Sequence, residues 1–145
     1  MEILPGVYGI SGFPRVEPME TIPERFLRLT KAGLIPDDFR DELCLALETG
    51  SGIVLLVGCA HPGIINMVRH VGARLGKPVR AVLGGTHLSE ADPARIRYTV
   101  DALEEVGVTL LGLSHCSGDG AESLIRQREG LTACHLGPGD CLFFP

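Results

Sequence analysis

Three histidines and two cysteines of this 145-residue chain follow three apolar segments, at the point where each segment ends. The first segment ends in Gly58-Cys59-Ala60-His61, the second in Gly84-Gly85-Thr86-His87 and the third in Ser114-His115-Cys116. Imidazole and thiolate groups are ligands that zinc prefers, and a thiol beside an imidazole can also serve as a nucleophile. These residue types therefore allow metal-assisted hydrolysis or cysteine-dependent catalysis.

The elements that carry these side chains alternate between strand and helix. Apolar runs predict strands at 53–58, 79–85 and 108–114, and apolar residues at helical spacing predict helices at 63–76 and 92–107. This alternation is typical of a mostly parallel sheet with right-handed crossover connections. Parallel strands place their carboxyl ends at one edge, where open α/β sheets bind ligands. His61, His87 and His115 are therefore expected to face one cavity at that edge.

The rest of the chain predicts smaller elements within one domain, residues 1–145. Two apolar runs on either side of Thr49-Gly50-Ser51-Gly52 predict an antiparallel hairpin. Prolines interrupt the first 35 or so residues, which are expected to be irregular apart from a helix at 23–31. Near the C-terminus we expect a helix at about 120–128 and two short strands at 131–136 and 141–144.

Several polar residues and thiols are predicted to have structural roles, with a place in the site as the alternative for Asp37 and Asp38. His70 falls within a predicted helix, where it is expected to be exposed, and His135 falls in a late strand. Asp37 and Asp38 form a polar turn that would cap a helix. The remaining cysteines are expected to be reduced thiols that act as small core residues: Cys44, Cys134 and Cys141.

Composition excludes several classes of partner. The net charge is −5 and the basic residues are scattered, so neither a nucleic-acid footprint nor a membrane-binding stripe is present. The N-terminus lacks the pattern of a signal peptide, and no apolar run reaches the roughly 18 residues of a membrane span. The sequence therefore predicts a cytoplasmic protein that binds neither nucleic acid nor membrane.

The choice between a metal site and a cysteine nucleophile is not decided by spacing. Three neutral imidazoles could hold a catalytic zinc that activates water. In the competing hypothesis the nucleophile is Cys59 or Cys116. The second hypothesis fits less well, because Cys116 is next to His115 in the sequence and is expected to point elsewhere.

Four segments carry a resemblance to a known family. They are "GVYGISGFPRVEPME", "DDFRDELCLALETGSGIVLLVGCAHPGIINMVRHV", "AVLGGTHLSEADPARIRYTVDAL" and "LSHCSGDGA". Together they resemble the C-terminal half of metallo-β-lactamase-fold hydrolases, in the 7,8-dihydropterin-6-methyl-4-(β-D-ribofuranosyl)-aminobenzene-5′-phosphate synthase-like branch. The resemblance implies an α/β fold, half of an αββα sandwich, with a mostly parallel sheet, crossover helices and an antiparallel hairpin.

The resemblance also implies roles for individual residues. His115 in "LSHCSG" matches the last metal-ligand histidine of the superfamily. The bridging aspartate of the superfamily has no counterpart after Gly58, so His61 is expected to be the ligand there, with Cys59 as the less favoured alternative. His87 would line the pocket, as a substrate or oxyanion contact or a proton donor. The implied metal is zinc or another divalent metal.

One large part of the family pattern is missing from these 145 residues. The main metal motif of the family, H-x-H-x-D-H, does not occur. We therefore expect a half-domain of a metal-dependent hydrolase that binds zinc weakly and is silent or weak until a separate N-terminal-half subunit complements it. Its substrate would be a small molecule, with a phosphorylated compound as one candidate, and a homodimer is the other expected assembly. A non-catalytic association module and a cysteine-dependent enzyme remain the alternatives.

Overall fold

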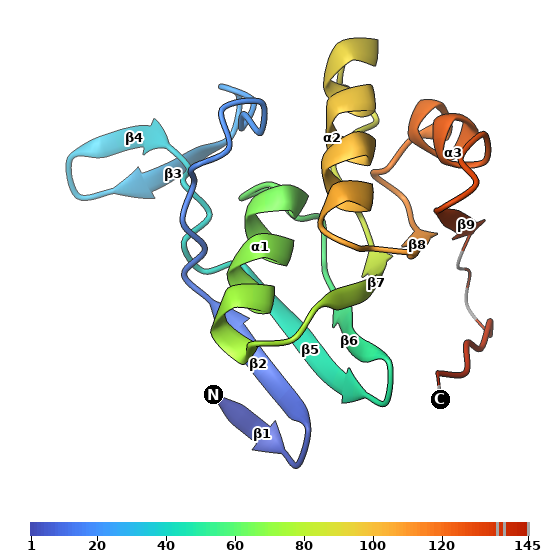
Figure 1. The fold of residues 1–145 in the computed structure, drawn as a ribbon. Coiled ribbons are helices and arrows are strands. Elements are labelled where there is room, and N and C mark those ends of the chain that lie inside the picture. The colour runs from blue at the N-terminus through green and yellow to red at the C-terminus, as the bar shows by residue number, and fades with distance from the viewer. Residues whose placement is uncertain (136, 138, 145) are drawn as a thin grey trace.

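Seven strands form one sheet in the computed structural model, which describes residues 1–135, 137 and 139–144. Their order across the sheet is β1-β2-β5-β6-β7-β8-β9 (Figure 1). The parallel strands are β6 (Gly52–Leu56), β7 (Val79–Gly84), β8 (Leu110–Leu113) and β9 (Thr132–His135). The antiparallel strands are β1 (Glu2–Leu4), β2 (Val7–Ser11) and β5 (Leu43–Thr49). The α/β class, the parallel strands and the hairpin between β5 and β6 are all confirmed.

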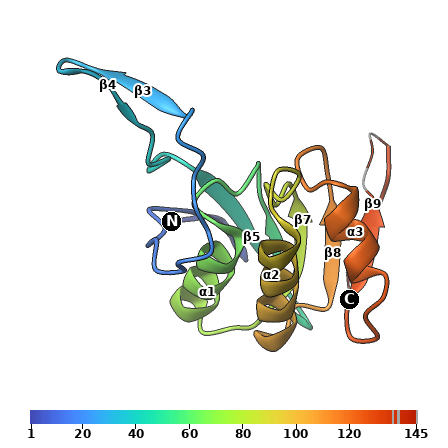
Figure 2. The ribbon, with the colours of Figure 1, turned by 90° about the horizontal axis from the view of Figure 1, so that it is seen from above.

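Three helices lie on the same side of the sheet (Figure 2). They are α1 (Ile64–Leu75), α2 (Pro93–Glu105) and α3 (Asp119–Ile125). Helix α1 ends at Gly76, whose left-handed φ of 63° is the usual way to stop a helix. Helix α2 begins after Asp92, whose side chain accepts a hydrogen bond of 2.8 Å from the backbone N–H of Arg95. The crossover helices therefore begin and end close to the predicted positions.

The core lies between the helices and one face of the sheet. Strand β6 contributes Ile53 and Leu55, both fully buried, and β7 and β8 contribute Val82 and Leu111 beside them. Ile64, Met67, Val68 and Val71 of α1 pack on these strands because they recur at helical spacing. Burial of this face fixes the ends of β6, β7 and β8, from which the candidate site is built.

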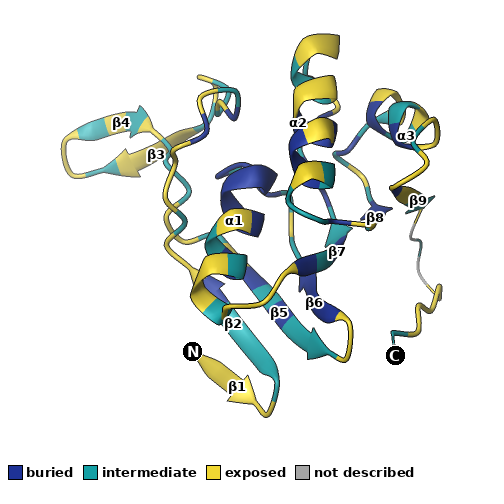
Figure 3. Cartoon of the chain, viewed as in Figure 1, coloured by how far each residue is buried: buried dark blue, intermediate teal, exposed yellow. Residues whose placement is uncertain are grey.

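The opposite face of the sheet is also apolar and is unevenly covered: Val54 and Ala81 on it are buried, whereas the leucines around them are half-buried. Along β5, buried residues alternate with the half-buried Leu45 and Leu47 (Figure 3). Leu45 pairs with Leu56 of β6, and Leu56 pairs in turn with Leu83 of β7, so these side chains share one face. Within the described residues, no helix lies on this side of the sheet (Figure 2). We call this surface, Leu45, Leu47, Leu56 and Leu83, the open sheet face.

The N-terminal third contradicts the sequence-based prediction. Residues 1–11 form two strands rather than irregular chain, and the helix expected at 23–31 is absent from this fully described stretch. In its place, β3 (Leu27–Thr30) and β4 (Gly33–Pro36) form an antiparallel hairpin that projects from the body (Figures 1 and 2). The reason is local: leucines alternate with polar residues in "LRLT", a strand pattern, and Gly33 at φ 108° accommodates the turn.

The other structural expectations have mixed outcomes. The helix near 120–128 and the strand near 131–136 are confirmed within the described residues, whereas 141–144 is not a strand. His70 does lie in a helix, but it is half-buried, with its ring 5.6 Å from that of Phe13. All five cysteines are free; Cys44 is buried as expected, but Cys141 is exposed. No helix among the described residues is long and apolar enough to cross a membrane.

Candidate metal centre

Two thiols and one imidazole meet at the carboxyl edge of the parallel strands. The Sγ atom of Cys59, after β6, lies 3.0 Å from Nε2 of His115, after β8. The Sγ atom of Cys116 belongs to the same group, and the three donor atoms all lie within 4.8 Å of one another. Among the described residues this is the one group of three or more histidine, cysteine or acidic side chains that could hold a metal ion.

Cys116 therefore does not point away from His115, which corrects the expectation from their adjacency in sequence. A tight turn closes after β8, where the N–H of Ser117 donates to the carbonyl of Ser114 over 2.9 Å. Tight turns redirect neighbouring side chains to the same side, so strand alternation no longer applies there. Gly85 leaves the necessary room: a Cβ atom at this position would lie 2.3 Å from the Cys116 sulfur.

His61 is held in a second, adjoining group of side chains. Its Nδ1 atom lies 2.8 Å from a carboxylate oxygen of Glu42, and its ring stacks on Phe39 with the centroids 4.0 Å apart. His87 is next to it, with a centroid distance of 4.9 Å, and Phe26 contacts both imidazoles edge-on. The structure thus pairs His61 with His87 and pairs His115 with Cys59. The metal roles of His61, His115 and Cys59 and the catalytic role of His87 stay predictions.

Backbone strain is concentrated around His61. Among the described residues, three that are not glycine have positive φ: Phe39 at 47°, Ala60 at 56° and His87 at 51°. One of these precedes His61 and the other two contact its ring. Such conformations cost about 1–3 kcal/mol each and persist where the surroundings enforce them, often at functional sites. The strain indicates that these side-chain positions are held by the fold.

Burial and neighbouring charges shift the pKa of one side chain in each group. Burial raises the pKa of the Cys59 thiol to about 11, with the neighbouring Cys116 thiol and the Glu42 carboxylate adding to the effect. Burial also lowers the pKa of His87, and the nearby His61 lowers it further. His87 is therefore biased toward the neutral imidazole, which can donate or accept a hydrogen bond. Glu42 accepts from His61 Nδ1–H in the arrangement that leaves the other ring nitrogen free to bind a metal.

The donor set fits zinc. Two thiolates and an imidazole are soft and borderline ligands, and zinc sites of the Cys2His type hold the metal with one position left open. A metal ion displaces thiol protons, so the high pKa of Cys59 opposes binding without preventing it. Three protein ligands make an incomplete first shell for a firm structural site, which requires four. The group suits one wall of a metal centre better than a closed site.

Several site residues had not been predicted from the sequence. Glu42 contacts His61 across 19 residues and also accepts a hydrogen bond from the N–H of Ala60, and neither contact has a local sequence signal. Asp37 forms the expected polar turn, accepting from the N–H of Phe39, but caps no helix. Asp38 pairs with Arg28 and Arg40. Neither aspartate belongs to the group that could hold a metal.

A buried carboxylate supports the loop that carries Cys59 and His61. Glu20 is 4% exposed and accepts hydrogen bonds from the backbone N–H groups of Ile65 and Asn66, at 2.7 and 2.9 Å. It thereby caps the first turn of α1 from a distant segment, where Gly63 offers no side chain. Burial raises its pKa to about 7, against the opposing effect of the two N–H donors.

This pKa predicts a pH dependence of stability. The folded-state pKa of Glu20 is about 7, above the value of 4.5 for a free glutamate, so its contribution to stability is fully present below pH 4.5 and is lost as pH rises through 7. Chemical denaturation should show the free energy of unfolding falling by about 2–3 kcal/mol from pH 5 to pH 8. Glu20→Gln should remove this slope, and Glu24→Gln, at an exposed position, should keep it. Equal slopes in all three proteins would contradict the assignment.

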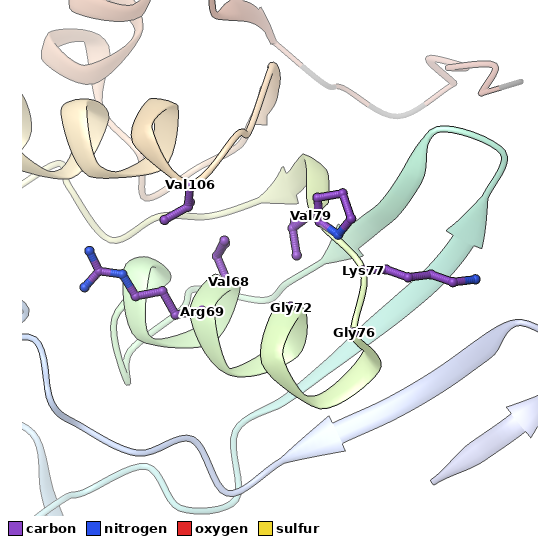
Figure 4. Close-up of a pocket in the computed structure, with 8 residues that line it drawn as sticks. Val68, Arg69, Gly72, Gly76, Lys77, Val79 and Val106 are labelled. Atoms are coloured by element: carbon purple, nitrogen blue, oxygen red, sulfur yellow. The ribbon is translucent and has the colours of Figure 1, made fainter.

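A shallow hollow of about 370 Å³ lies away from these groups, between the end of α1, the start of β7 and the end of α2 (Figure 4). Its lining residues are Val68, Arg69, Gly72, Gly76, Lys77, Pro78, Val79 and Val106. Because β7 begins here, the hollow is at the amino edge of the parallel strands, opposite the candidate metal centre. No histidine, cysteine or acidic side chain that could hold a metal lines it, so it is not the candidate metal centre.

Comparison with known proteins identifies relatives over nearly the whole chain. No family model matches it. The 7,8-dihydropterin-6-methyl-4-(β-D-ribofuranosyl)-aminobenzene-5′-phosphate synthase of Methanocaldococcus jannaschii is 33% identical over 94% of this chain and 49% of its own length. An uncharacterized protein of the same archaeon is 28% identical over 88% of this chain and 47% of its own length. The chain thus spans about half the length of these curated relatives.

A solved structure agrees in three dimensions. The crystal structure of Tm1679, described as a metal-dependent hydrolase of the β-lactamase superfamily, superposes with a TM-score of 0.83 at 26% identity. The match covers 93% of this chain and 53% of that one. The predicted resemblance is confirmed. The chain has the fold of about half of a metal-dependent β-lactamase-superfamily hydrolase, and the Cys59–His115–Cys116 group lies within it.

Proposed function

We propose that this chain supplies one wall of the zinc centre of a metal-dependent hydrolase. One observation carries the proposal: Cys59, His115 and Cys116 bring three donor atoms together at the carboxyl edge of the parallel strands. The similarity to a metal-dependent hydrolase supports it. Zinc at this position would act as a Lewis acid and lower the pKa of a bound water.

One group of residues would bind the metal, and the other would contact the substrate. Cys59 and His115 hold the metal, with Cys116 as a third donor. His61, oriented by Glu42, lies two residues from Cys59 and either completes the wall or faces the substrate beside His87. His87 contacts the substrate or donates a proton. Similarity to a ribofuranosyl-aminobenzene-phosphate synthase supports a small, phosphorylated molecule as the substrate class.

The other wall would come from a polypeptide that carries the H-x-H-x-D-H motif, in the same chain or in a separate subunit. The motif does not occur in these 145 residues, and the matched relatives are about twice as long. Without it, the three donor atoms of this chain are too few for a closed metal site. The chain alone is therefore proposed to be silent or weak in catalysis, and to act in the cytoplasm.

Metal titration tests the proposal. The reduced chain should bind zinc weakly and substoichiometrically, and cobalt should give the sulfur-to-metal charge-transfer absorption of thiolate ligation. Cys59→Ala and His115→Ala should each weaken binding at least about tenfold, because each removes one of three donors. Cys141→Ala, at an exposed position outside the group, is the matched control and should change nothing. Zinc affinity that is unchanged in both site variants would overturn the proposal.

A cysteine-dependent enzyme is the second candidate, favoured by one contact. The sulfur of Cys59 lies 3.0 Å from His115 Nε2, and the Ser114 hydroxyl lies 3.2 Å from the other ring nitrogen. A nucleophile (Cys59), a base (His115) and a group that orients the base (Ser114) are therefore in contact one after another. Activity that survives strong chelation but is lost on thiol alkylation would support this candidate. Activity lost on chelation and restored by zinc would support the metal centre. No activity even when this chain is combined with a half that carries the H-x-H-x-D-H motif would leave a non-catalytic association module.

A further inference from the structure

Cys59 and Cys116 meet although they follow strands that are not neighbours. One follows β6 and the other follows β8, and β7 lies between these strands in the sheet. Their sulfur atoms nevertheless lie within 4.8 Å, and both residues are half-buried rather than enclosed. The other three thiols are placed differently: Cys44 is buried under the helices, Cys134 is in β9 and Cys141 is exposed near the C-terminus.

The approach of the two thiols depends on a glycine beneath them. Gly85 follows β7, and a Cβ atom there would lie 2.3 Å from the Cys116 sulfur and 3.2 Å from the Cys59 Cα atom. Any side chain at this position would thus occupy the space in which the two loops meet. A disulfide bond is about 2 Å long, so the two sulfurs, now within 4.8 Å, must still approach each other. The Cys116 sulfur already lies 3.9 Å from the backbone carbonyl oxygen of Cys59, which places it against the residue that it would join.

We infer that Cys59 and Cys116 form a reversible disulfide that acts as a redox switch on the metal centre. With hydrogen peroxide as oxidant, one thiol loses its proton and attacks an oxygen atom as the thiolate: an S–O bond forms, the O–O bond breaks, and the released hydroxide takes up the proton and leaves as water. The second thiol then attacks that sulfur, so that an S–S bond forms, the S–O bond breaks and a second water leaves. The two sulfurs lose two electrons in total, and the two thiol protons leave in the waters.

The disulfide would remove two donors from the candidate metal centre and leave His115 alone. This regulatory consequence rests on the proposed metal function, whereas bond formation itself does not. Bound zinc would in turn protect the thiols, because thiolates engaged with a metal are poorer nucleophiles toward peroxide. Oxidation and zinc binding at this pair are therefore expected to exclude each other.

Peptide mapping of the oxidised chain tests the inference. The reduced chain is treated with hydrogen peroxide near stoichiometry, alkylated, digested and analysed by mass spectrometry. We expect a linked pair of peptides containing Cys59 and Cys116, with a mass decrease of about 2 Da. Cys44, Cys134 and Cys141 should remain available for alkylation after denaturation. A thiol reductant should restore all five, and prior addition of zinc should slow the reaction severalfold.

Variants separate the outcomes. Cys59→Ser and Cys116→Ser should each abolish the linked peptide, and Cys141→Ser should leave it unchanged. Linkage of either thiol to Cys134 or Cys141 instead, or sulfinic acid formation at Cys59 with no linkage, would overturn the inference. A Cys59–Cys116 linkage in a chain that binds no zinc when reduced would refute the proposed metal function but support the disulfide. Zinc binding by the reduced chain without any linkage after oxidation would support the metal function and refute the disulfide.

Discussion

At micromolar concentration the isolated chain is expected to sediment as a species larger than its 15.5 kDa monomer. The open sheet face explains why. Leucine side chains from β5, β6 and β7 lie half-buried on it, and no described helix covers them. Covering the exposed part of these side chains would contribute roughly 25 cal/mol per Å² of apolar surface removed from water, before the costs of association. We propose a two-fold homodimer through this face, or a complementing half that occupies the same face.

Two substitutions distinguish this face from the other exposed apolar surface. Leu47→Glu on β5 should shift the chain toward monomer, because it places a charge in the proposed interface. Leu29→Glu on the projecting hairpin is the matched control: Leu29 is 80% exposed, but it is on the separate two-stranded sheet. Its assembly state should not change. A stable monomer that binds no apolar dye, or equal effects of the two variants, would rule out the open sheet face as the interface.

Gly84→Ala is expected to destabilise the fold severely. Gly84 ends β7 at φ 135°, and a Cβ atom there would lie 2.1 Å from the carbonyl oxygen of Val57. Residues with a side chain rarely adopt this backbone conformation. The new Cβ atom would also meet the backbone carbonyl of Val57, which cannot rotate away as a side chain could. Strain and overpacking together should cost about 3–6 kcal/mol, a large fraction of the stability of a small domain.

Gly76→Ala provides the control for this prediction. Gly76 also has positive φ, at 63°, but nothing lies within 4 Å of its missing Cβ. Only the conformational penalty of about 1 kcal/mol should apply. Thermal and chemical denaturation would compare the two variants. A Gly84→Ala protein as stable as the Gly76→Ala protein would mean that β6 and β7 can separate at their carboxyl ends, where the candidate site lies.

The strand and helix units from β6 to β8 could be predicted from the sequence because their signals are local. Apolar runs, the Asp92 cap and the terminal glycines Gly76 and Gly107 define each element without reference to the rest of the chain. The strands of the N-terminal third lack local signals of this kind. Strands β1 and β2 exist because β2 pairs with β5, more than 30 residues later, and short strands carry little periodicity of their own. Proline content concealed them further.

The edge of the sheet at which the candidate residues lie could be predicted, but the contacts between them could not. Placing His61, His87 and His115 after successive parallel strands followed from topology, and the structure does put all three strand ends at one edge. The partners depend on tertiary contacts: Glu42 reaches His61 from another segment, and Cys116 joins Cys59 only because a tight turn and Gly85 allow it. Side-chain direction after a strand ends cannot be inferred from alternation within the strand.

The order of the strands has a consequence for how the molecule forms. Apart from the projecting hairpin, each successive strand in the described part of the chain is added beside the previous one, and none of these strands is inserted between two that have already paired. Every pairing therefore closes the shortest loop available to it, which keeps the entropic cost of each step low. Such a sheet can nucleate at the β5–β6 hairpin and grow outward, so a ribosome-bound chain can complete each parallel pair as soon as its crossover helix emerges.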